Sequence, residues 1–305
     1  MLFLLPAVSL FAQETASLAY YQLRLKELLE DLRNATDDSS RLEASDLFEA
    51  AFAAQLAKKE AFTFAFDSLK GITASGSPDK KFRIFTWPVR LGTGGYRLYG
   101  ILQIPDKKSG SNRVIRLTDL GDTMSGPETA ILDTSSWFGA VYYQVIPVRG
   151  ADGMVFYTLL GWRGLSTLVS SRVADVLTLG PGGDISFGRQ VFCDKAPLPV
   201  KRLIFRYSAN ASMVLTYEKQ SLVTARKWNA KTREFETEKI REMMIVCDRV
   251  LPMDPQMEGR YEYYLPASDV MDGYIFREGC WTLVRDVDAR NPEHKSGPLP
   301  RDPGK

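Results

Sequence analysis

The chain has 305 residues, of which 45% are hydrophobic and 25% are charged. This length and composition suffice for one large domain or two ordinary ones with a buried core, and they exclude disorder throughout the chain. The 25% charged fraction is that of an average soluble protein, and 39 Lys and Arg against 37 Asp and Glu leave a near-neutral formal charge of +2. It argues against a dedicated nucleic-acid-binding protein, whose surface usually concentrates basic residues.

The first 13 residues, MLFLLPAVSLFAQ, form an uncharged apolar run. The run is shorter than the roughly 20 apolar residues that cross a bilayer, and it resembles the hydrophobic region and cleavage site of an export signal. Because the basic residues that usually precede such a region are missing, the alternative is that the run is the buried start of the first helix. No Cys follows the expected cleavage site, so a lipoprotein anchor has no attachment point. We therefore expect a signal peptide over residues 1–13 and a periplasmic or secreted protein that is not an integral membrane protein.

Two amphipathic helices are predicted next, forming a helical hairpin over residues 14–60. The first helix carries an apolar stripe with helical spacing, made of Leu18, Tyr21, Leu25, Leu28 and Leu32. The second is expected to begin with a capping box at residues 40–43, where Ser40 and Glu43 would bond each other's exposed backbone N–H groups. Its stripe consists of Phe48, Phe52 and Leu56.

From Phe62 the apolar pattern changes to the period of two that is typical of strands, first in residues 62–66. Residues 153–188 show the pattern most clearly, with apolar runs between short turns that contain Gly and Ser. Further strands are predicted at 81–87, 96–104, 111–117, 137–148, 154–162, 173–179, 185–192, 202–208, 213–218, 221–228, 243–250, 261–264, 274–277 and 281–285. We therefore expect a mainly β protein, with an antiparallel β-meander or sandwich-like sheet over 61–290 and a flexible tail over 291–305.

The three cysteines, Cys193, Cys247 and Cys280, lie far apart in the sequence. In an exported protein two of them could form a disulfide and leave the third over, and the sequence does not choose among the three pairings. The alternative is three buried free thiols. With a single His in the chain, a Cys/His zinc site has almost no ligands to use, so no metal or cofactor is expected.

Four segments resemble a family of uncharacterised exported proteins from Gram-negative bacteria of the Bacteroidetes type. They are residues 77–87 (SPDKKFRIFTW), 156–162 (FYTLLGW), 185–188 (ISFG) and 286–291 (DVDARN). The resemblance extends from about residue 13 to residue 291 and implies export without implying an activity. The first segment also resembles the strand openings of β-propeller blades, so a propeller-like fold is the alternative architecture.

Aromatic side chains are the candidate ligand-binding residues. Trp87, Trp137 and Trp162 lie on predicted strands and could form a stacking platform for a glycan or peptide if they share an exposed face. Core packing is the competing interpretation, because strands favour aromatic residues for packing reasons alone.

Catalytic patterns are weak in this sequence. The glycine-rich segments 92–95 and 180–184 lack the phosphate-binding pattern and are predicted to be turns. Acids at strand ends could supply the carboxylate pair of a hydrolase, and the candidates are Asp175, Asp184, Asp248, Asp269 and Asp272. Asp286, Asp288, Asn291 and Glu293 could offer oxygen ligands to Ca²⁺, although the EF-hand loop pattern is absent.

These observations predict an exported, non-catalytic binding or envelope-structural module. Its expected partner is an envelope protein or a glycan, with no nucleic acid. The alternatives are a carboxylate-based hydrolase with a cleft at the strand ends, and an assembly subunit that docks through its helical hairpin.

Overall fold

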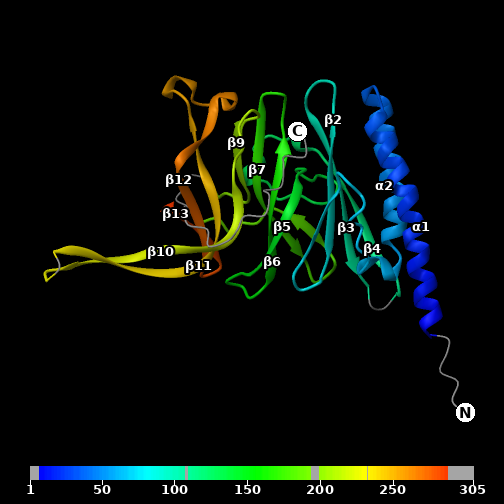
Figure 1. Ribbon diagram of the computed structural model, residues 1–305, viewed down its shortest axis with the longest axis horizontal. Helices are drawn as coiled ribbons and strands as arrows, with labels where there is room; N and C mark the ends of the chain where they lie inside the picture. Colours follow the sequence, from blue (N-terminus) through cyan, green and yellow to red (C-terminus); the bar gives the residue numbers. More distant parts are fainter. Residues whose placement is uncertain (1–6, 107–108, 194–198, 232, 288–305) are drawn as a thin grey trace, which may run out of the picture. The chain divides into compact units, whose positions relative to one another are not determined.

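The computed structural model describes residues 7–106, 109–193, 199–231 and 233–287. Two helices are followed by three antiparallel sheets, each of which joins strands that are mostly consecutive in the sequence (Figure 1). The predicted class, mainly β with an N-terminal helical hairpin, is confirmed. The propeller alternative is wrong for the described chain, because a propeller needs at least about four blades and only three sheets are present. The tail predicted over 291–305 lies outside the described residues.

The helices are α1 (Ala7–Asn34) and α2 (Asp38–Leu56). Helix α1 begins inside the segment expected to be a signal peptide. Helix α2 is capped by Asp37, whose Oδ1 accepts a hydrogen bond of 2.9 Å from the Ser40 backbone N–H. The predicted capping box at Ser40 is therefore wrong by one turn, since an Asp immediately before the helix already satisfies the exposed N–H group. No helix of the described chain is long and apolar enough to cross a membrane.

The first sheet contains β1 (Thr73–Gly76), β2 (Arg83–Arg90), β3 (Tyr96–Pro105) and β4 (Asn112–Thr118) in that order. The predicted stripe of α2 packs on it: Phe48 and Phe52 are fully buried, and their rings contact Trp87 and Phe85 edge to face. Leu25 of α1 joins the same core. The apolar side predicted for the helices and the apolar side predicted for the first strands thus bury each other.

The segment 62–66, predicted as a strand, has no strand partner. It follows the 3₁₀ helix η1 (Lys59–Phe62), and the Arg83 guanidinium takes the place of a neighbouring strand by donating to the backbone carbonyls of Ala61, Phe62 and Phe64 at 3.1, 3.1 and 2.9 Å. The alternating aromatics are nevertheless used, because Phe66 is part of the buried core. The alternating aromatic residues of this segment therefore indicate that one side of it is buried, although the segment is not paired in a sheet.

The second sheet contains β5 (Val141–Arg149), β6 (Val155–Gly164), β7 (Val169–Leu179), β8 (Ile185–Phe187) and β9 (Leu203–Ser208). Strand β6 pairs with β7, and both are buried over nearly their whole length. The end of β7 pairs with β8 and its start with β9. The hairpins predicted for residues 153–188 are confirmed by these pairings.

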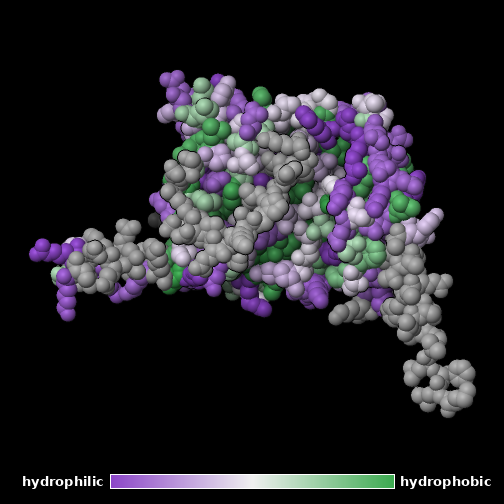
Figure 2. All heavy atoms as spheres, in the orientation of Figure 1, coloured by the Kyte–Doolittle hydropathy of each residue, from purple (hydrophilic) through white to green (hydrophobic). Residues whose placement is uncertain are grey.

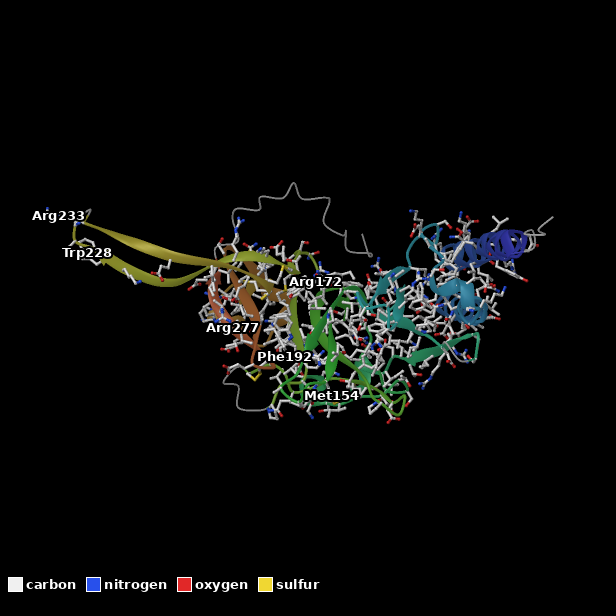
Figure 3. The ribbon with its side chains drawn as sticks, turned by 90° about the horizontal axis from the view of Figure 1, so that it is seen from below. Met154, Arg172, Phe192, Trp228, Arg233 and Arg277 are labelled. Atoms are coloured by element: carbon white, nitrogen blue, oxygen red, sulfur yellow. A yellow bond between two sulfur atoms is a disulfide. The ribbon has the colours of Figure 1, made fainter. Side chains whose placement is uncertain are left out.

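The third sheet contains β10 (Leu215–Asn229), β11 (Glu234–Pro252), β12 (Tyr264–Arg277) and β13 (Cys280–Val287). Strand β10 pairs along its whole length with residues 234–247 of β11, but β12 pairs with β11 only from Met244 onward. Residues 219–229 and 234–243 are therefore a two-stranded extension, called the outer ribbon below, with Trp228 and Arg233 at its far end (Figure 3). The sequence predicted two short strands at 213–218 and 221–228 and none between 229 and 242, so the ribbon is a feature that it missed.

Short 3₁₀ helices occupy several connections: η2 (Gly121–Thr123), η3 (Pro127–Thr129), η4 (Pro255–Met257) and η5 (Tyr261–Tyr263). The last of these replaces most of the strand predicted at 261–264. The chain divides into two compact units, one of residues 1–124 and 132–145 and the other of residues 125–131 and 146–305. The helices and first sheet belong to the former, and the third sheet to the latter.

Candidate functional site: an exposed apolar face at the end of a β-hairpin

The three tryptophans predicted to bind ligand are buried. Trp87, Trp137 and Trp162 are 1%, 0% and 3% exposed. The first two belong to one compact unit of the chain, and Trp162 belongs to the other. The Trp87 indole donates to the Ser45 hydroxyl at 3.0 Å and stacks on Tyr99, and the Trp137 indole donates to the Tyr142 hydroxyl at 3.1 Å. The shared exposed face that a stacking platform requires is therefore missing, and core packing accounts for all three.

Asp175, one of the predicted hydrolase carboxylates, lies in a fully buried ion pair. Its Oδ1 accepts from Arg202 Nε at 3.0 Å, and both side chains are 0% exposed. Arg202 also donates to the backbone carbonyls of Pro127 and Ala130, so the pair ties β7 to the segment that carries η3. Because a buried charge is tolerated only when paired and hydrogen-bonded, these contacts give Asp175 a structural role.

Asp272 is also held by arginines. Arg249 donates to it with Nε at 3.1 Å and Nη2 at 2.5 Å, and Arg285 with Nη1 at 2.7 Å. Burial works to raise the pKa of Asp272, but the hydrogen bonds and charges of these two arginines outweigh it and hold the pKa below its ordinary value. A carboxylate held ionised in this way is a poor general acid.

The remaining predicted acids give no reacting pair either. Burial raises the pKa of Asp248, whose carboxylate accepts a hydrogen bond of 2.7 Å from the Val214 backbone N–H. Asp184 is exposed at the end of a glycine-rich turn, as predicted for that segment, and the side chain of Asp269 lies outside the described part. Of the predicted Ca²⁺ ligands, Asp286 is bound by Arg249 at 2.8 Å and the others lie outside the described residues. The described residues contain no cluster of three or more His, Cys, Asp and Glu that could hold a metal ion.

A perturbed acid that the sequence did not reveal is Glu49 on α2. Burial raises its pKa to about 7, an effect opposed by the charge of Arg116 at 3.9 Å and reinforced by that of Asp46. Nearby, the Tyr99 hydroxyl donates to Asp46 at 2.8 Å, and burial first and this bond second raise the pKa of Tyr99. No sequence pattern marks Glu49, because its environment is created by β4 and by the packing of α2 on the sheet.

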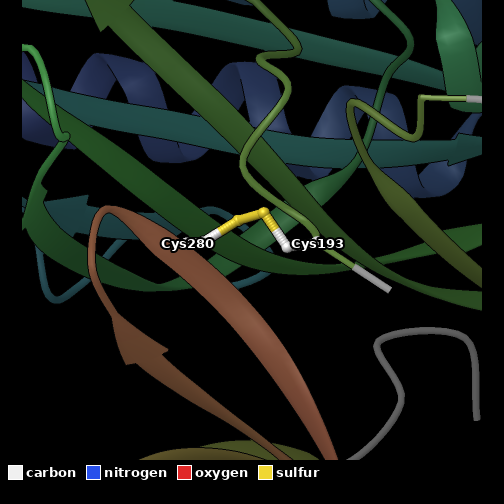
Figure 4. The surroundings of a disulfide bond; sticks show 2 residues. All are labelled: Cys193 and Cys280. Carbon is white, nitrogen blue, oxygen red and sulfur yellow. A yellow bond between two sulfur atoms is a disulfide. The ribbon is translucent and has the colours of Figure 1, made fainter. Parts of the chain in front are cut away.

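The cysteine pairing left open by the sequence is Cys193–Cys280 (Figure 4). Cys247 is free and buried. Next to the disulfide, the backbone N–H of Cys193 donates to Trp281 O at 3.0 Å, and that of Trp281 donates to Val191 O at 2.6 Å. The bond therefore fastens the segment after β8 to the start of β13. Burial first, and the nearby Asp272 second, raise the pKa of Cys247 to about 12, which makes its thiol unreactive.

In the compact unit of residues 125–131 and 146–305, the clearest exposed feature is an apolar face at the end of the β11–β12 hairpin. Leu251 and Leu265 are directly opposite each other in the register, so they lie on the same side of the hairpin. Met253 follows Leu251 by two residues and continues that side, because its backbone N–H donates to Tyr263 O at 3.0 Å. These three side chains are 49%, 38% and 68% exposed and are called the apolar face below.

The apolar face is held in place by the structure of the loop beside it. Asp254 caps η4 by accepting from the Gln256 backbone N–H at 2.8 Å, and the Tyr264 hydroxyl accepts from the Gly259 backbone N–H at 2.9 Å. Tyr261 and Tyr264 have ring centroids 5.1 Å apart. Because the loop is closed by these hydrogen bonds and by the packed tyrosine rings, it holds the residues of the apolar face in a fixed arrangement.

Charged residues of both signs surround this loop. Arg260 lies over the Tyr263 ring at 4.6 Å and pairs with Glu262 at 3.1 Å. Arg206 lies over the Tyr261 ring at 5.4 Å and pairs with Glu128 at 2.7 Å. Apolar residues with a rim of Tyr, Arg and paired charges are typical of protein-binding surfaces.

Comparison with known proteins adds no relative: no protein-family model, curated protein or solved structure matches the chain. The apolar face was missed from the sequence because its members belong to two strands and a loop. The one available signal was the pair of short apolar runs at 250–253 and 264–266, which gave no indication of exposure.

Proposed function

We propose that this chain is an exported, non-catalytic binding module of the cell envelope, and that it binds a protein partner through the apolar face. The observation that carries the proposal is the exposure of Leu251, Met253 and Leu265 on one side of a paired hairpin. Isolated apolar residues are common on protein surfaces, but cross-strand neighbours that stay exposed together form a contiguous apolar surface.

A protein partner is favoured over a glycan by the composition of this surface. Its centre consists of aliphatic side chains, which contribute by apolar burial, whereas the tyrosines next to it are already engaged with each other and with arginines. Binding is favoured over hydrolysis because Asp175 and Asp272 are held in ion pairs with arginine. Export is supported by the apolar N-terminal run and by the disulfide, since disulfides persist mainly in oxidising compartments.

Site-specific photocrosslinking tests the proposal. A photoreactive amino acid at Met253 is expected to capture one defined protein in envelope fractions, and Leu251→Asp is expected to abolish that product. The matched control places the same amino acid at Leu47, which is 56% exposed on α2. The same product from both positions, or undiminished capture by the Leu251→Asp protein, would show that the apolar face is not the binding surface. Recovery of the protein only from cytosol would refute export.

A further inference from the structure

The outer ribbon is a second exposed feature, separate from the apolar face. Because β12 pairs with β11 only from Met244 onward, the two strands of the outer ribbon pair only with each other. Arg277 at the end of β12 donates to Glu242 at the base of the ribbon at 2.9 and 2.8 Å. A two-stranded ribbon of this kind is marginally stable in water by itself. Figure 2 shows hydrophilic side chains gathered at the far end of the ribbon.

The register sorts the charges of the outer ribbon onto opposite faces. Positions on one face alternate along each strand, and the bulge between Val223 and Ala225 preserves this order in the pairs that follow it. The basic face comprises the register positions of Lys219, Ser221, Val223, Arg226, Trp228, Phe235, Thr237, Lys239, Arg241 and Met243, which include four cations and no acid. The acidic face comprises those of Gln220, Leu222, Ala225, Lys227, Asn229, Glu234, Glu236, Glu238, Ile240 and Glu242, which include four acids and one cation.

Described side chains agree with this sorting. On the acidic face, Lys227 Nζ lies 2.5 Å from Glu238 Oε1, which requires the two residues to be on the same side of the ribbon. On the basic face, Trp228 and Met243 are 55% and 45% exposed, and Lys219 and Arg241 are exposed as well. Lys231 and Arg233 add two exposed cations at the turn beside Trp228 (Figure 3).

We infer that the basic face of the outer ribbon docks on the surface of an anionic lipid bilayer. Cations on one face suit a flat negative surface, since each Lys or Arg near such a surface strengthens binding about fivefold. Trp228 at the far end matches the preference of indole rings for the membrane interface, where one edge is apolar and the other is hydrated. The acidic face then points away from the lipid. At the base of the ribbon its Gln220 is buried and Leu222 packs against the core, whereas Lys227 and Glu238 farther out are exposed to water.

The acidic face is what favours a membrane over a nucleic acid. A ribbon in the major groove lies between two phosphate backbones, so the carboxylates of Glu238 and Glu242 on the acidic face would lie close to phosphates. A flat surface contacts one face only and avoids this repulsion. The acidic face of a second copy of the chain could also supply the negative charge that this basic face binds. The experiment below distinguishes such self-association from binding to lipid.

Vesicle binding of the full chain tests the inference. The protein is expected to co-sediment with vesicles of equal parts phosphatidylglycerol and phosphatidylcholine, to bind phosphatidylcholine vesicles far more weakly, and to be released by high salt. Lys231→Gln/Arg233→Gln is expected to weaken binding about 25-fold, because two cations are removed. The matched control, Lys70→Gln/Lys81→Gln, makes the same change in net charge at exposed positions of the first unit and is expected to bind like the unmodified protein.

Tryptophan fluorescence supplies an independent readout. Of the five tryptophans, Trp87, Trp137, Trp162 and Trp281 are at most 3% exposed, so Trp228 is the one that can respond to lipid. Brominated lipid is expected to quench emission of the unmodified protein but not that of Trp228→Phe. Circular dichroism confirms that each variant is folded.

Three outcomes would overturn the inference. The first is an equal loss of binding in the tip and control variants, which would indicate net charge alone. The second is tighter binding to a DNA duplex than to the anionic vesicles. The third is concentration-dependent self-association that requires Lys231 and Arg233 and proceeds without lipid, which would assign the basic face to a second copy.

Discussion

Replacing Glu49 with Gln is expected to stabilise the protein at alkaline pH and to have little effect at acid pH. Glu49 lies on α2 with its side chain 13% exposed, and Arg116 is its single ion-pair partner among the described contacts, at 3.9 Å. Burial raises the pKa of Glu49 from an ordinary value of 4.5 to about 7. The folded state therefore binds this proton more tightly than the unfolded state does.

The magnitude follows from the two pKa values. Between pH 4.5 and about 7 the folded state holds more protons, so its stability falls as the pH rises through this range. At about 1.4 kcal/mol per pKa unit, the ionised carboxylate costs about 3 kcal/mol above pH 7. Gln removes this cost, in which the opposing attraction of Arg116 is already included. The expected gain at pH 8 is about 3 kcal/mol.

Urea unfolding followed by circular dichroism, at half-unit steps from pH 4.5 to 8.5, measures the free energy of unfolding of both proteins. Other titrating groups cancel in the difference between them. Glu43→Gln, at an exposed position of the same helix, makes the same change in charge and is the control. A constant difference for Glu49→Gln, or a loss of stability at pH 8, would refute burial as the cause of the raised pKa.

Three further predictions concern the core, the backbone and the cysteines. Phe52→Ala is expected to reduce the free energy of unfolding by about 3–5 kcal/mol because the ring is fully buried, whereas Leu47→Ala, at an exposed position of the same helix, changes it by less than about 0.5 kcal/mol in a urea titration. Gly188→Ala is expected to cost at least about 2 kcal/mol, since its φ is +90° and a Cβ would lie 2.5 Å from Ala130 O; an unchanged thermal midpoint would contradict this. Thiol titration is expected to find no reactive thiol in the native protein, one after denaturation, from Cys247, and three after reduction, and any thiol that reacts rapidly in the native state would contradict the pairing.

Elements that bury a regular face were predictable from the sequence. The stripe of Phe48, Phe52 and Leu56 repeats with the period of a helix because one side of α2 is covered by a sheet. The runs that became β6 and β7 are apolar along their length because both strands are buried nearly throughout. In each case burial imposed the pattern that the sequence displays.

The outer ribbon and the candidate site could not be predicted in this way. Residues 229–242 are rich in charged side chains, so hydrophobic periodicity gives no signal for a strand that is held by its partner's backbone. Trp87 and Leu251 show the opposite problem: both lie on strands with apolar neighbours, yet one is 1% and the other 49% exposed. Exposure depends on which element covers a face, and that is settled by distant parts of the chain.

The disulfide determines how the protein would respond to proteolysis. Cys193 and Cys280 enclose a covalent loop, and Lys231 and Arg233 at the end of the outer ribbon lie within it. A trypsin-like protease that cuts at this exposed turn would produce two polypeptides still linked by the bond, which separate on a gel only after reduction. The most accessible part of the third sheet could thus be nicked while the strands on both sides of the cut remain attached to each other.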